Sequence, residues 1–405
     1  MKIKKEIFKA GFLACLFLFS LLSSAAEVKI KKNKEGGYTL FVDGKPFLIK
    51  GIIYNPTPIG EGYDYNLFSD PRKPWLFDGK LMKEAGINVV RIYSCRGSDL
   101  EKVKQFIRDL YKNYGIYTIV SDWLGLWEKP SPNYADKKFR QYTKEKVLEI
   151  VKALKDEKGL LMWILGNENN YTFSGKIAFW TSPEIEKIPD LYERVRKRAQ
   201  IYYSFVDEVA SEIKKIDPHH PVALGNGEVS MLDIAAKVCK NIDVVAVISY
   251  RGKRFGNLFE NIRYLFDKPV LVSEFGCDSY DAYKDEEAQD IQAEYIKLQW
   301  EDILKNTTLQ NKKGNCIGGT LFEWSDEWWK HNEGYTPGWS VHDKQAGWSC
   351  GSYYFDIKAK NNLNMNEEWF GIVELSEEKD ENGLNKRIPK KAYYTLKEIF
   401  SSLKF

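Results

Sequence analysis

The feature that most restricts the fold of this chain is a repeated alternation of short apolar runs with amphipathic segments. Eight runs are almost continuously apolar, as expected for parallel strands that are buried on both faces. They span residues 46–54, 87–93, 116–123, 160–168, 221–226, 243–250, 269–276 and 316–324. Helical patterns such as LEKVKQFIRDLYKNYG separate them. Eight such units predict an α/β fold of the (β/α)8 TIM-barrel type. An open doubly wound sheet is the alternative, but no Gly-rich dinucleotide fingerprint follows any run.

The remaining segments predict additions to one barrel. VKIKK and YTLFVDG, with Asp43-Gly44 as the turn, predict a short N-terminal β-hairpin. Long loops should follow strands 4 and 8 of the barrel. No Pro/Ser-rich linker and no internal repeat divides residues 27–405, so we expect a single domain there.

Residues 1–26 have the pattern of a signal peptide. A lysine-rich start precedes the apolar run AGFLACLFLFSLL, and Ser24-Ala25-Ala26 supplies small residues for cleavage. We therefore expect a secreted or periplasmic protein. An uncleaved anchor and a lipoprotein modified at Cys15 are alternatives, although the residues before Cys15 form a poor lipobox.

The charge of the chain indicates few macromolecular partners. Loss of this leader removes four lysines and one glutamate, which takes the formal charge of +3 to zero. No basic block remains, so we expect neither a nucleic-acid partner nor membrane binding beyond the leader. The oligomeric state is left open.

The five cysteines beyond the leader are sparse and show no CxxC spacing, which argues against a disulfide scaffold or a zinc site. A Cys277–Cys350 bridge and five separate thiols are both compatible with the sequence. We expect no metal and no cofactor.

Polar residues gather where the apolar runs end, which is the end of a (β/α)8 barrel that carries active sites. Two carboxylates, Glu168 and Glu274, directly terminate strands four and seven. Three strands separate them around the ring, so both can face one central pocket. A retaining glycosidase needs such a pair: one carboxylic acid protonates the leaving oxygen, and the other attacks the anomeric carbon. A plain ion pair between Glu274 and Arg91 is the structural alternative.

The segments WILGNE and LVSEFG resemble the acid/base and nucleophile signatures of the retaining (β/α)8 glycosidase superfamily, clan A in type. DGKPFLIKGIIYNP, EAGINVVRIY and GGTLFEWSDEWW resemble its first, second and eighth strands, so the likeness covers the chain beyond the leader. Within this superfamily, the sequence most resembles the barrels of family 2 and family 5 enzymes and the β-1,3-glucanosyltransferases. Family 5 enzymes usually carry histidines near strands three and six, which this chain lacks.

The resemblance implies a role for each matching residue. Glu168 would be the acid/base and Glu274 the nucleophile. Asn167 would bind the sugar 2-hydroxyl, and Arg91 and Tyr250 would bind the nucleophile. Trp324 would form the floor of the −1 sugar site. Arg91 as a barrel salt bridge and Tyr250 as core packing are the alternatives.

Aromatic residues are abundant, with 12 Trp, 24 Tyr and 22 Phe, and many lie in Gly-, Asn- and Ser-rich segments. Aromatic rings can stack on the apolar faces of sugars. Trp123, after strand three, is therefore a candidate sugar contact, as is the carboxylate of Glu323 for sugar hydroxyls. Packing of a long loop against the barrel is the other reading.

Three functions follow. The first is a secreted retaining hydrolase that cleaves β-glycosidic bonds, with a β-glucan as the expected oligo- or polysaccharide. The second is a β-glucan transglycosidase that uses the same residues. The third is a non-catalytic carbohydrate-binding protein.

Overall fold

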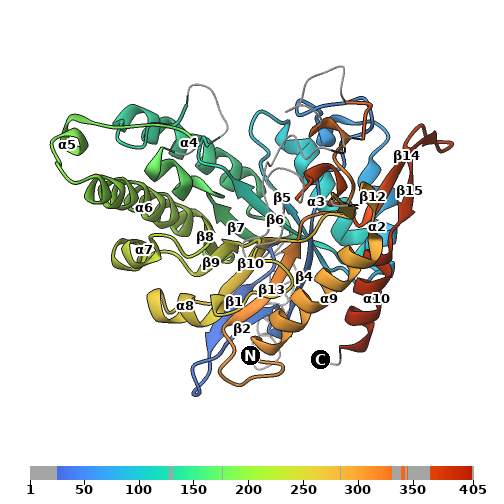
Figure 1. Cartoon of the computed structure of the whole chain (residues 1–405). Coiled ribbons are helices and arrows are strands. Elements are labelled where there is room, and N and C mark those ends of the chain that lie inside the picture. Colours follow the sequence, from blue (N-terminus) through green and yellow to red (C-terminus); the bar gives the residue numbers. More distant parts are fainter. Residues whose placement is uncertain are drawn as a thin grey trace, which may run out of the picture.

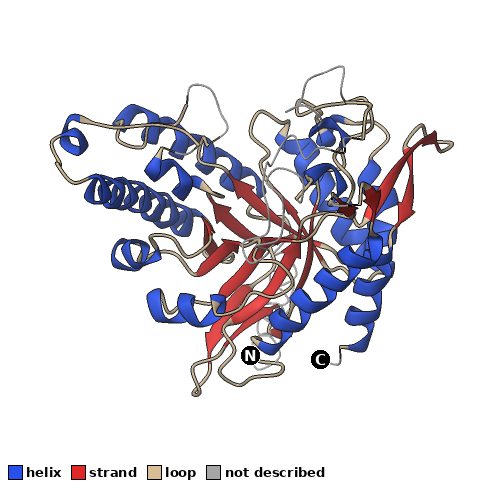
Figure 2. Cartoon of the chain, viewed as in Figure 1, coloured by secondary structure: helices blue, strands red, loops and turns tan. Residues whose placement is uncertain are grey.

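The computed structural model describes residues 25–126, 131–175, 177–282, 284–330, 339–342, 344 and 365–403. Within this part of the chain, eight parallel strands close into a barrel in the order β10-β13-β4-β5-β6-β7-β8-β9, which confirms the predicted architecture (Figures 1 and 2). The strands are β4 (Ile49–Ile53), β5 (Val89–Ile92), β6 (Tyr117–Asp122), β7 (Leu160–Leu165), β8 (Val222–Gly227), β9 (Val244–Ile248), β10 (Val270–Phe275) and β13 (Cys316–Leu321).

A helix follows each barrel strand along the chain. These helices are α2 (Pro74–Glu84), α3 (Leu100–Tyr114), α4 (Lys137–Leu154), α6 (Leu191–Ile216), α7 (Leu232–Val238), α8 (Leu258–Leu265), α9 (Gln289–Lys305) and α10 (Lys391–Ser402). Three of these helices have an aspartate at the N-cap, where the carboxylate accepts a hydrogen bond from an otherwise unpaired backbone amide of the first turn. Asp99, Asp136 and Asp190 make this contact at α3, α4 and α6.

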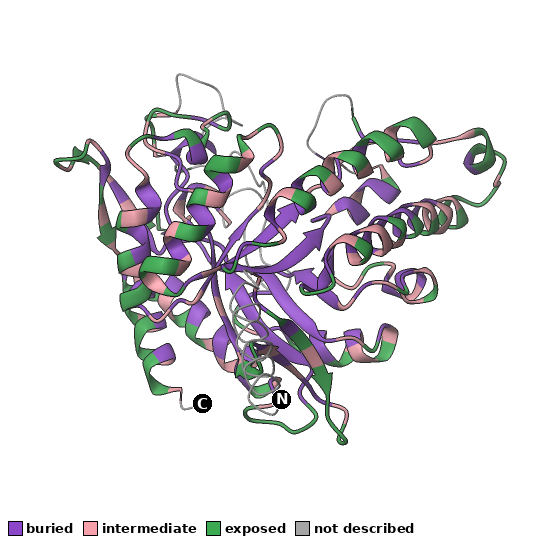
Figure 3. Cartoon of the chain, turned by 180° about the vertical axis from the view of Figure 1, so that it is seen from behind, coloured by how far each residue is buried: buried purple, intermediate pink, exposed green. Residues whose placement is uncertain are grey.

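The largest apolar cluster fills the layer between the strands and the helices, which bury one face each. Figure 3 shows the same division: the strands are buried along their length, while the helices expose their outer faces. Because the barrel strands are buried on both sides, polar side chains at their carboxyl ends stand out as candidates for function.

A small antiparallel sheet, β1 (Val28–Lys32), β2 (Tyr38–Val42) and β3 (Lys45–Phe47), precedes the barrel. The predicted hairpin therefore gains a third strand, β3. The single strand expected over 46–54 is in fact two strands, β3 and β4, which are separated by Leu48. Val28, Leu40 and Val42 pack in one cluster with barrel residues such as Ile49. The sheet thus covers the amino-terminal floor of the barrel.

Long excursions follow β7 and β13, as predicted. The first contains η2 (Asn169–Ser174) and the short helix α5 (Pro183–Glu186). The second includes η5 (Glu367–Trp369) and a ribbon of β14 (Val373–Lys379) and β15 (Asn385–Pro389), which the sequence reading did not anticipate. The other short elements are η1 (Leu67–Ser69), β11 (Tyr280–Asp281) and β12 (Glu286–Glu287).

Among the described residues, no helix has both the length and the apolar character needed to cross a membrane. Most of the predicted signal peptide and Cys350, one half of the suggested bridge, lie outside the described residues. Both remain predictions.

Candidate active site

Glu274 lies near the carboxyl end of β10, where three side chains from two other strands bind its carboxylate. The hydroxyl of Tyr93 donates to Oε2 at 2.7 Å, and the hydroxyl of Tyr250 donates to Oε1 at 3.0 Å. The guanidinium of Arg91 approaches Oε2 at 3.4 Å. Hydrogen bonds and a nearby cation stabilise the ionised form of a carboxylate, which is the form that a nucleophile needs.

Both phenols remain donors over the working pH range of a protein. Burial, and after it the charge of Glu274, raises the pKa of Tyr93 and of Tyr250 well above the ordinary value for tyrosine. Each hydroxyl therefore keeps its proton and directs it toward the carboxylate. The two tyrosines hold different oxygens, so the carboxylate is fixed in orientation as well as in charge.

Arg91, on β5, is fully buried and connects four strands at the centre of the barrel. Its guanidinium donates to the Ser273 carbonyl at 2.7 Å, to Ser121 Oγ at 3.1 Å and to Asn167 Oδ1 at 2.7 Å. Five donors in a rigid plane suit this branching role, which a lysine could not fill. Arg91 therefore links the candidate nucleophile to the residue that precedes Glu168.

Glu168 follows β7 and is the first residue before η2. Its side chain is partly exposed, whereas Asn167, Asn169 and Asn170 beside it are buried. Asn169 accepts from the Asn167 amide at 2.7 Å and donates to the Trp123 carbonyl at 2.8 Å. These contacts attach the segment that carries Glu168 to the end of β6.

The turn before Glu168 needs a glycine. Gly166 has a φ of +80°, and a Cβ there would lie 2.2 Å from the hydroxyl of Tyr202. In the GNE tripeptide, a glycine that the backbone requires thus precedes the two candidate site residues, Asn167 and Glu168.

Trp123 is half-buried, and its ring centre lies 5.9 Å from that of Tyr93. It therefore lies next to a residue that binds the candidate nucleophile, which is compatible with a sugar contact.

Trp324 occupies a different place from the predicted one. Its side chain is 0% exposed and packs in the core between strands and helices, with its ring centre 6.4 Å from that of Tyr393 on α10. This burial does not match a floor for a sugar ring. Phe322 is the aromatic residue of this segment that borders the site, since it clusters with Tyr93 and Tyr250.

Glu323 is also fully buried, so in this conformation it presents no carboxylate to a substrate hydroxyl. Burial, and then the neighbouring Glu327 carboxylate, raises its pKa well above the usual range. The ammonium of Lys330 lies 2.6 Å from Glu327 and pairs with Glu367 as well. The carboxylates of Glu327 and Glu367 outweigh the effect of burial and raise the pKa of Lys330.

This acid-rich group borders the site. Burial raises the pKa of Glu367, and the charges of Glu327 and then of Glu274 add to this effect. The Lys330 ammonium lies 5.0 Å from the Phe322 ring centre. We call Glu323, Glu327, Lys330 and Glu367 the acidic wall.

Sequence reasoning brought together the residues that the structure groups around Glu274, namely Arg91, Asn167 and Tyr250. It missed Tyr93 as a site residue, although Tyr93 follows Arg91 by two positions and so shares its side of the strand. It named Glu323, but it did not predict that the segment from Glu323 to Lys330 meets Glu367, which is distant in sequence. Among the described residues, no group of three or more His, Cys, Asp or Glu side chains has an arrangement suited to a metal ion.

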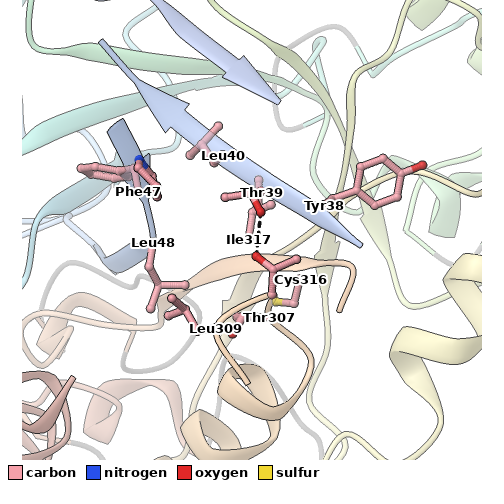
Figure 4. Close-up of a pocket in the computed structure, with 11 residues that line it drawn as sticks. Tyr38, Thr39, Leu40, Phe47, Leu48, Thr307, Leu309, Cys316 and Ile317 are labelled. Carbon is pink, nitrogen blue, oxygen red and sulfur yellow. Dashed lines mark hydrogen bonds between the residues drawn. The ribbon is translucent and has the colours of Figure 1, made fainter. Parts of the chain in front are cut away.

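A shallow recess lies at the opposite end of the barrel, between β2 and the segment before β13 (Figure 4). Its volume is about 30 Å³. Thr39 and Thr308 hydrogen bond across it at 2.7 Å, and its other walls are mainly apolar. The recess is a packing feature of the barrel floor and lies away from the carboxylates.

Comparison with known proteins gives one sequence relative and several structural ones. No family model matches the chain. A stretch of 158 residues is 30% identical to the 1,3-beta-glucanosyltransferase gas1 of Schizosaccharomyces pombe, and it covers 36% of this chain and 27% of that protein.

Two solved structures illustrate the structural likeness. A β-glucuronidase of Bacteroides uniformis matches 92% of this chain with a TM-score of 0.57 and 15% identity, and this match spans 37% of the glucuronidase. The endo-1,4-β-mannanase of Rhizomucor miehei matches 74% of this chain and 90% of its own, with a TM-score of 0.50 and 15% identity. The chain therefore shares the (β/α)8 barrel fold of these glycosidases, in agreement with the segments by which its sequence resembles that superfamily.

Proposed function

We propose that the protein is a retaining glycoside hydrolase that cleaves a β-linked oligo- or polysaccharide, with Glu274 as nucleophile and Glu168 as acid/base. The observation that carries this proposal is the binding of the Glu274 carboxylate by Tyr93, Tyr250 and Arg91 at the carboxyl end of the barrel. Three donors from different directions fix the orientation of this carboxylate.

The proposed reaction has two displacements. Glu168 protonates the leaving oxygen while a Glu274 oxygen bonds to the anomeric carbon, giving a covalent glycosyl-enzyme. Glu168, now ionised, then removes a proton from water as the water oxygen displaces Glu274. Each displacement inverts the anomeric centre, so the product keeps the β configuration. In this scheme Asn167, whose side chain accepts from Arg91, would bind the sugar 2-hydroxyl.

A β-glucan is the proposed substrate, and the predicted leader supports export. A transglycosidase is the second candidate, supported by the segment that matches a 1,3-beta-glucanosyltransferase. In that reaction a sugar hydroxyl replaces water in the second displacement. The third candidate, a carbohydrate-binding protein, would use the same aromatic and polar groups without turnover.

The test compares the wild type with Glu274→Ala, Glu168→Ala and Glu208→Gln on β-1,3-, β-1,4- and β-1,6-glucans and mannan. Glu208→Gln is the control, because it removes a surface carboxylate that pairs with Lys144 on the helical layer. We expect no turnover by Glu274→Ala and full activity in the control. Added azide should restore turnover in Glu168→Ala, since azide needs no general base.

Product analysis separates the candidates. Proton NMR of fresh product should show the β anomer, and products longer than the substrate would indicate transfer. Activity that survives in Glu274→Ala would disprove the assignment of the nucleophile. Binding of glucan without any product, in wild type and variants alike, would favour the binding protein.

A further inference from the structure

Glu228, the residue after β8, has its carboxylate occupied by protein donors. Arg251 Nε lies 3.0 Å from each carboxylate oxygen, and Arg251 Nη2 lies 2.6 Å from Oε2. Ser249 Oγ donates to Oε1 at 2.5 Å. These contacts engage both oxygens of the Glu228 carboxylate.

The two residues that bind Glu228 flank Tyr250 in the sequence. Ser249 is held a second time, because its backbone amide donates to the Glu274 carbonyl at 2.9 Å. Arg251 is 5% exposed in its side chain and also donates to the Phe255 carbonyl at 2.9 Å. Tyr250 is thus fixed on both sides, with its hydroxyl 3.0 Å from Glu274 Oε1.

Glu228 itself is anchored to the barrel. Its amide donates to the Ile248 carbonyl at 2.9 Å, and its φ of +52° turns the chain sharply after β8. Asn170 pairs with the preceding Gly227 in both directions, donating to its carbonyl at 2.9 Å and accepting from its amide at 2.8 Å. The anchor of Glu228 is therefore joined to the segment that carries Glu168.

We propose that Glu228 is a positioning residue for the nucleophile, which it serves by holding Ser249 and Arg251 and through them Tyr250. The inference rests on the proposed function of Glu274. A continuous chain of contacts, Asn170–Gly227–Glu228–Ser249–Glu274, then joins the segment after Glu168 to the strand that carries Glu274. Glu228 makes no contact with the reacting atoms in this scheme.

The test is a double-mutant cycle of Glu228→Gln and Tyr250→Phe, with Glu208→Gln as the matched control. Glutamine keeps the shape of Glu228 but loses its charge, so its grip on Arg251 weakens. We expect kcat to fall about 10- to 100-fold with KM changed less than about threefold, since small displacements at a reacting group have costs of this size. In the Tyr250→Phe background the same change should cost less than about threefold.

Two results would overturn the inference. A rise in KM at constant kcat would mean that Glu228 binds sugar directly. A full loss in both backgrounds would mean that it acts independently of Tyr250. Glu228→Asp, which keeps the charge, should recover part of kcat. If Glu228→Gln does not fold, Ser249→Ala removes one of the two contacts and gives a milder form of the same cycle.

A readout independent of turnover separates this inference from the proposed function. The Glu274 carboxyl can be followed by carbon NMR in protein with labelled glutamate, using Glu274→Gln to identify its signal. At pH 7 its carbon chemical shift should move in Tyr250→Phe and in Glu228→Gln but not in Glu208→Gln, because the hydrogen bond from Tyr250 to the carboxylate is removed in the first variant and displaced in the second. An unmoved signal in Glu228→Gln would refute the inference, whatever the enzyme activity. A moved signal in a protein that cleaves nothing leaves the positioning intact and refutes the proposed function.

Discussion

At the scale of single residues, the site depends on donors that hold one carboxylate. Arg91 supplies charge and Tyr93 and Tyr250 supply hydroxyl groups, each from a strand end. The tyrosines offer the cleaner test, because phenylalanine keeps the ring and removes only the hydroxyl. Arg91 is fully buried and binds four partners, so its replacement would disturb the fold as well.

We expect Tyr93→Phe and Tyr250→Phe each to lower kcat by about 10- to 100-fold, since each removes a buried hydrogen bond to a charged group. Steady-state kinetics at pH 7 measures this effect, with Tyr264→Phe, an 89% exposed position, as the control. An unchanged kcat in both variants would contradict this account.

The acidic wall leads to a prediction on substrate charge. Among the described residues, the ammonium of Lys330 pairs with both the Glu327 and the Glu367 carboxylates, so the acids outnumber the cation in this group even with Glu323 protonated. A substrate carboxylate about 6 Å from one excess negative charge would cost roughly 3 kcal/mol at an effective dielectric of about 20, or about 100-fold. We therefore expect kcat/KM for a C6-oxidised glucan to be lower than for the parent glucan by about that factor.

Glu367→Gln should reduce the preference for the parent glucan over the oxidised glucan by about tenfold. Glu398→Gln, at an exposed site on α10, should leave this preference unchanged. Competition between the two polymers measures the ratio within one sample. Equal cleavage of both polymers by the wild type would show that the acidic wall does not act on substrate charge.

Sequence reasoning placed residues within strands more accurately than residues beyond the strand ends. Glu274 and Arg91 lie within strands, where alternation decides the side to which a chain points. Trp324 lies three residues beyond the end of β13, where no such alternation applies, and it turned out to be core. The acidic wall joins residues 323–330 with Glu367, and no local pattern indicates that these segments meet.

At the scale of elements, the segment after β13 is held by stacked rings. The ring of His342 lies 3.6 Å from that of Trp369 and 4.8 Å from that of Trp328, almost parallel to both. Its Nε2 donates to the Glu368 carbonyl at 3.1 Å. The stack fastens the segment around η5 to the residues that follow β13. Sequence periodicity predicted the barrel strands and helices well, but it contains no signal for contacts of this kind.

This stack predicts a loss of stability in acid. Burial, and then the charge of Lys390, lowers the pKa of His342 to about 3, whereas an unfolded histidine titrates near 6.5. The unfolded state therefore binds more protons between these values, and the free energy of unfolding falls as the pH drops from about 6.5 to 3. The slope from this group is at most about 1.4 kcal/mol per pH unit.

Urea unfolding at pH 7, 6, 5 and 4 measures this slope. His342→Phe keeps an aromatic ring in the stack and removes the titrating group, so its stability should depend less on pH than that of the wild type. His219→Phe, at an exposed histidine, is the control and should leave the slope unchanged. Equal slopes in His342→Phe and the wild type would mean that folding does not lower the pKa of His342.

At the scale of the whole molecule, the two ends of the barrel serve different purposes. The candidate catalytic groups lie at the carboxyl ends of the strands, while the sheet β1–β3 closes the other end with apolar side chains. Val28 extends this closure by a backbone bond from its amide to the His219 carbonyl, at 3.0 Å. Substitutions at the carboxyl ends of the strands should therefore affect activity, whereas substitutions in the barrel floor should affect stability.

Leu40 is the residue that tests this separation, because it is 1% exposed in the barrel floor. Leu40→Ala removes buried methyl groups and leaves a cavity, so we expect the free energy of unfolding to fall by about 2 to 4 kcal/mol. At a temperature where the variant is folded, kcat and KM should stay within about twofold of the wild type, since the floor does not touch the strand ends that bind Glu274. Tyr264→Ala, on the exposed surface, should change neither quantity. A loss of kcat in folded Leu40→Ala would mean that packing at the floor sets the geometry of the carboxylates, and the barrel would then act as one mechanical unit from floor to mouth.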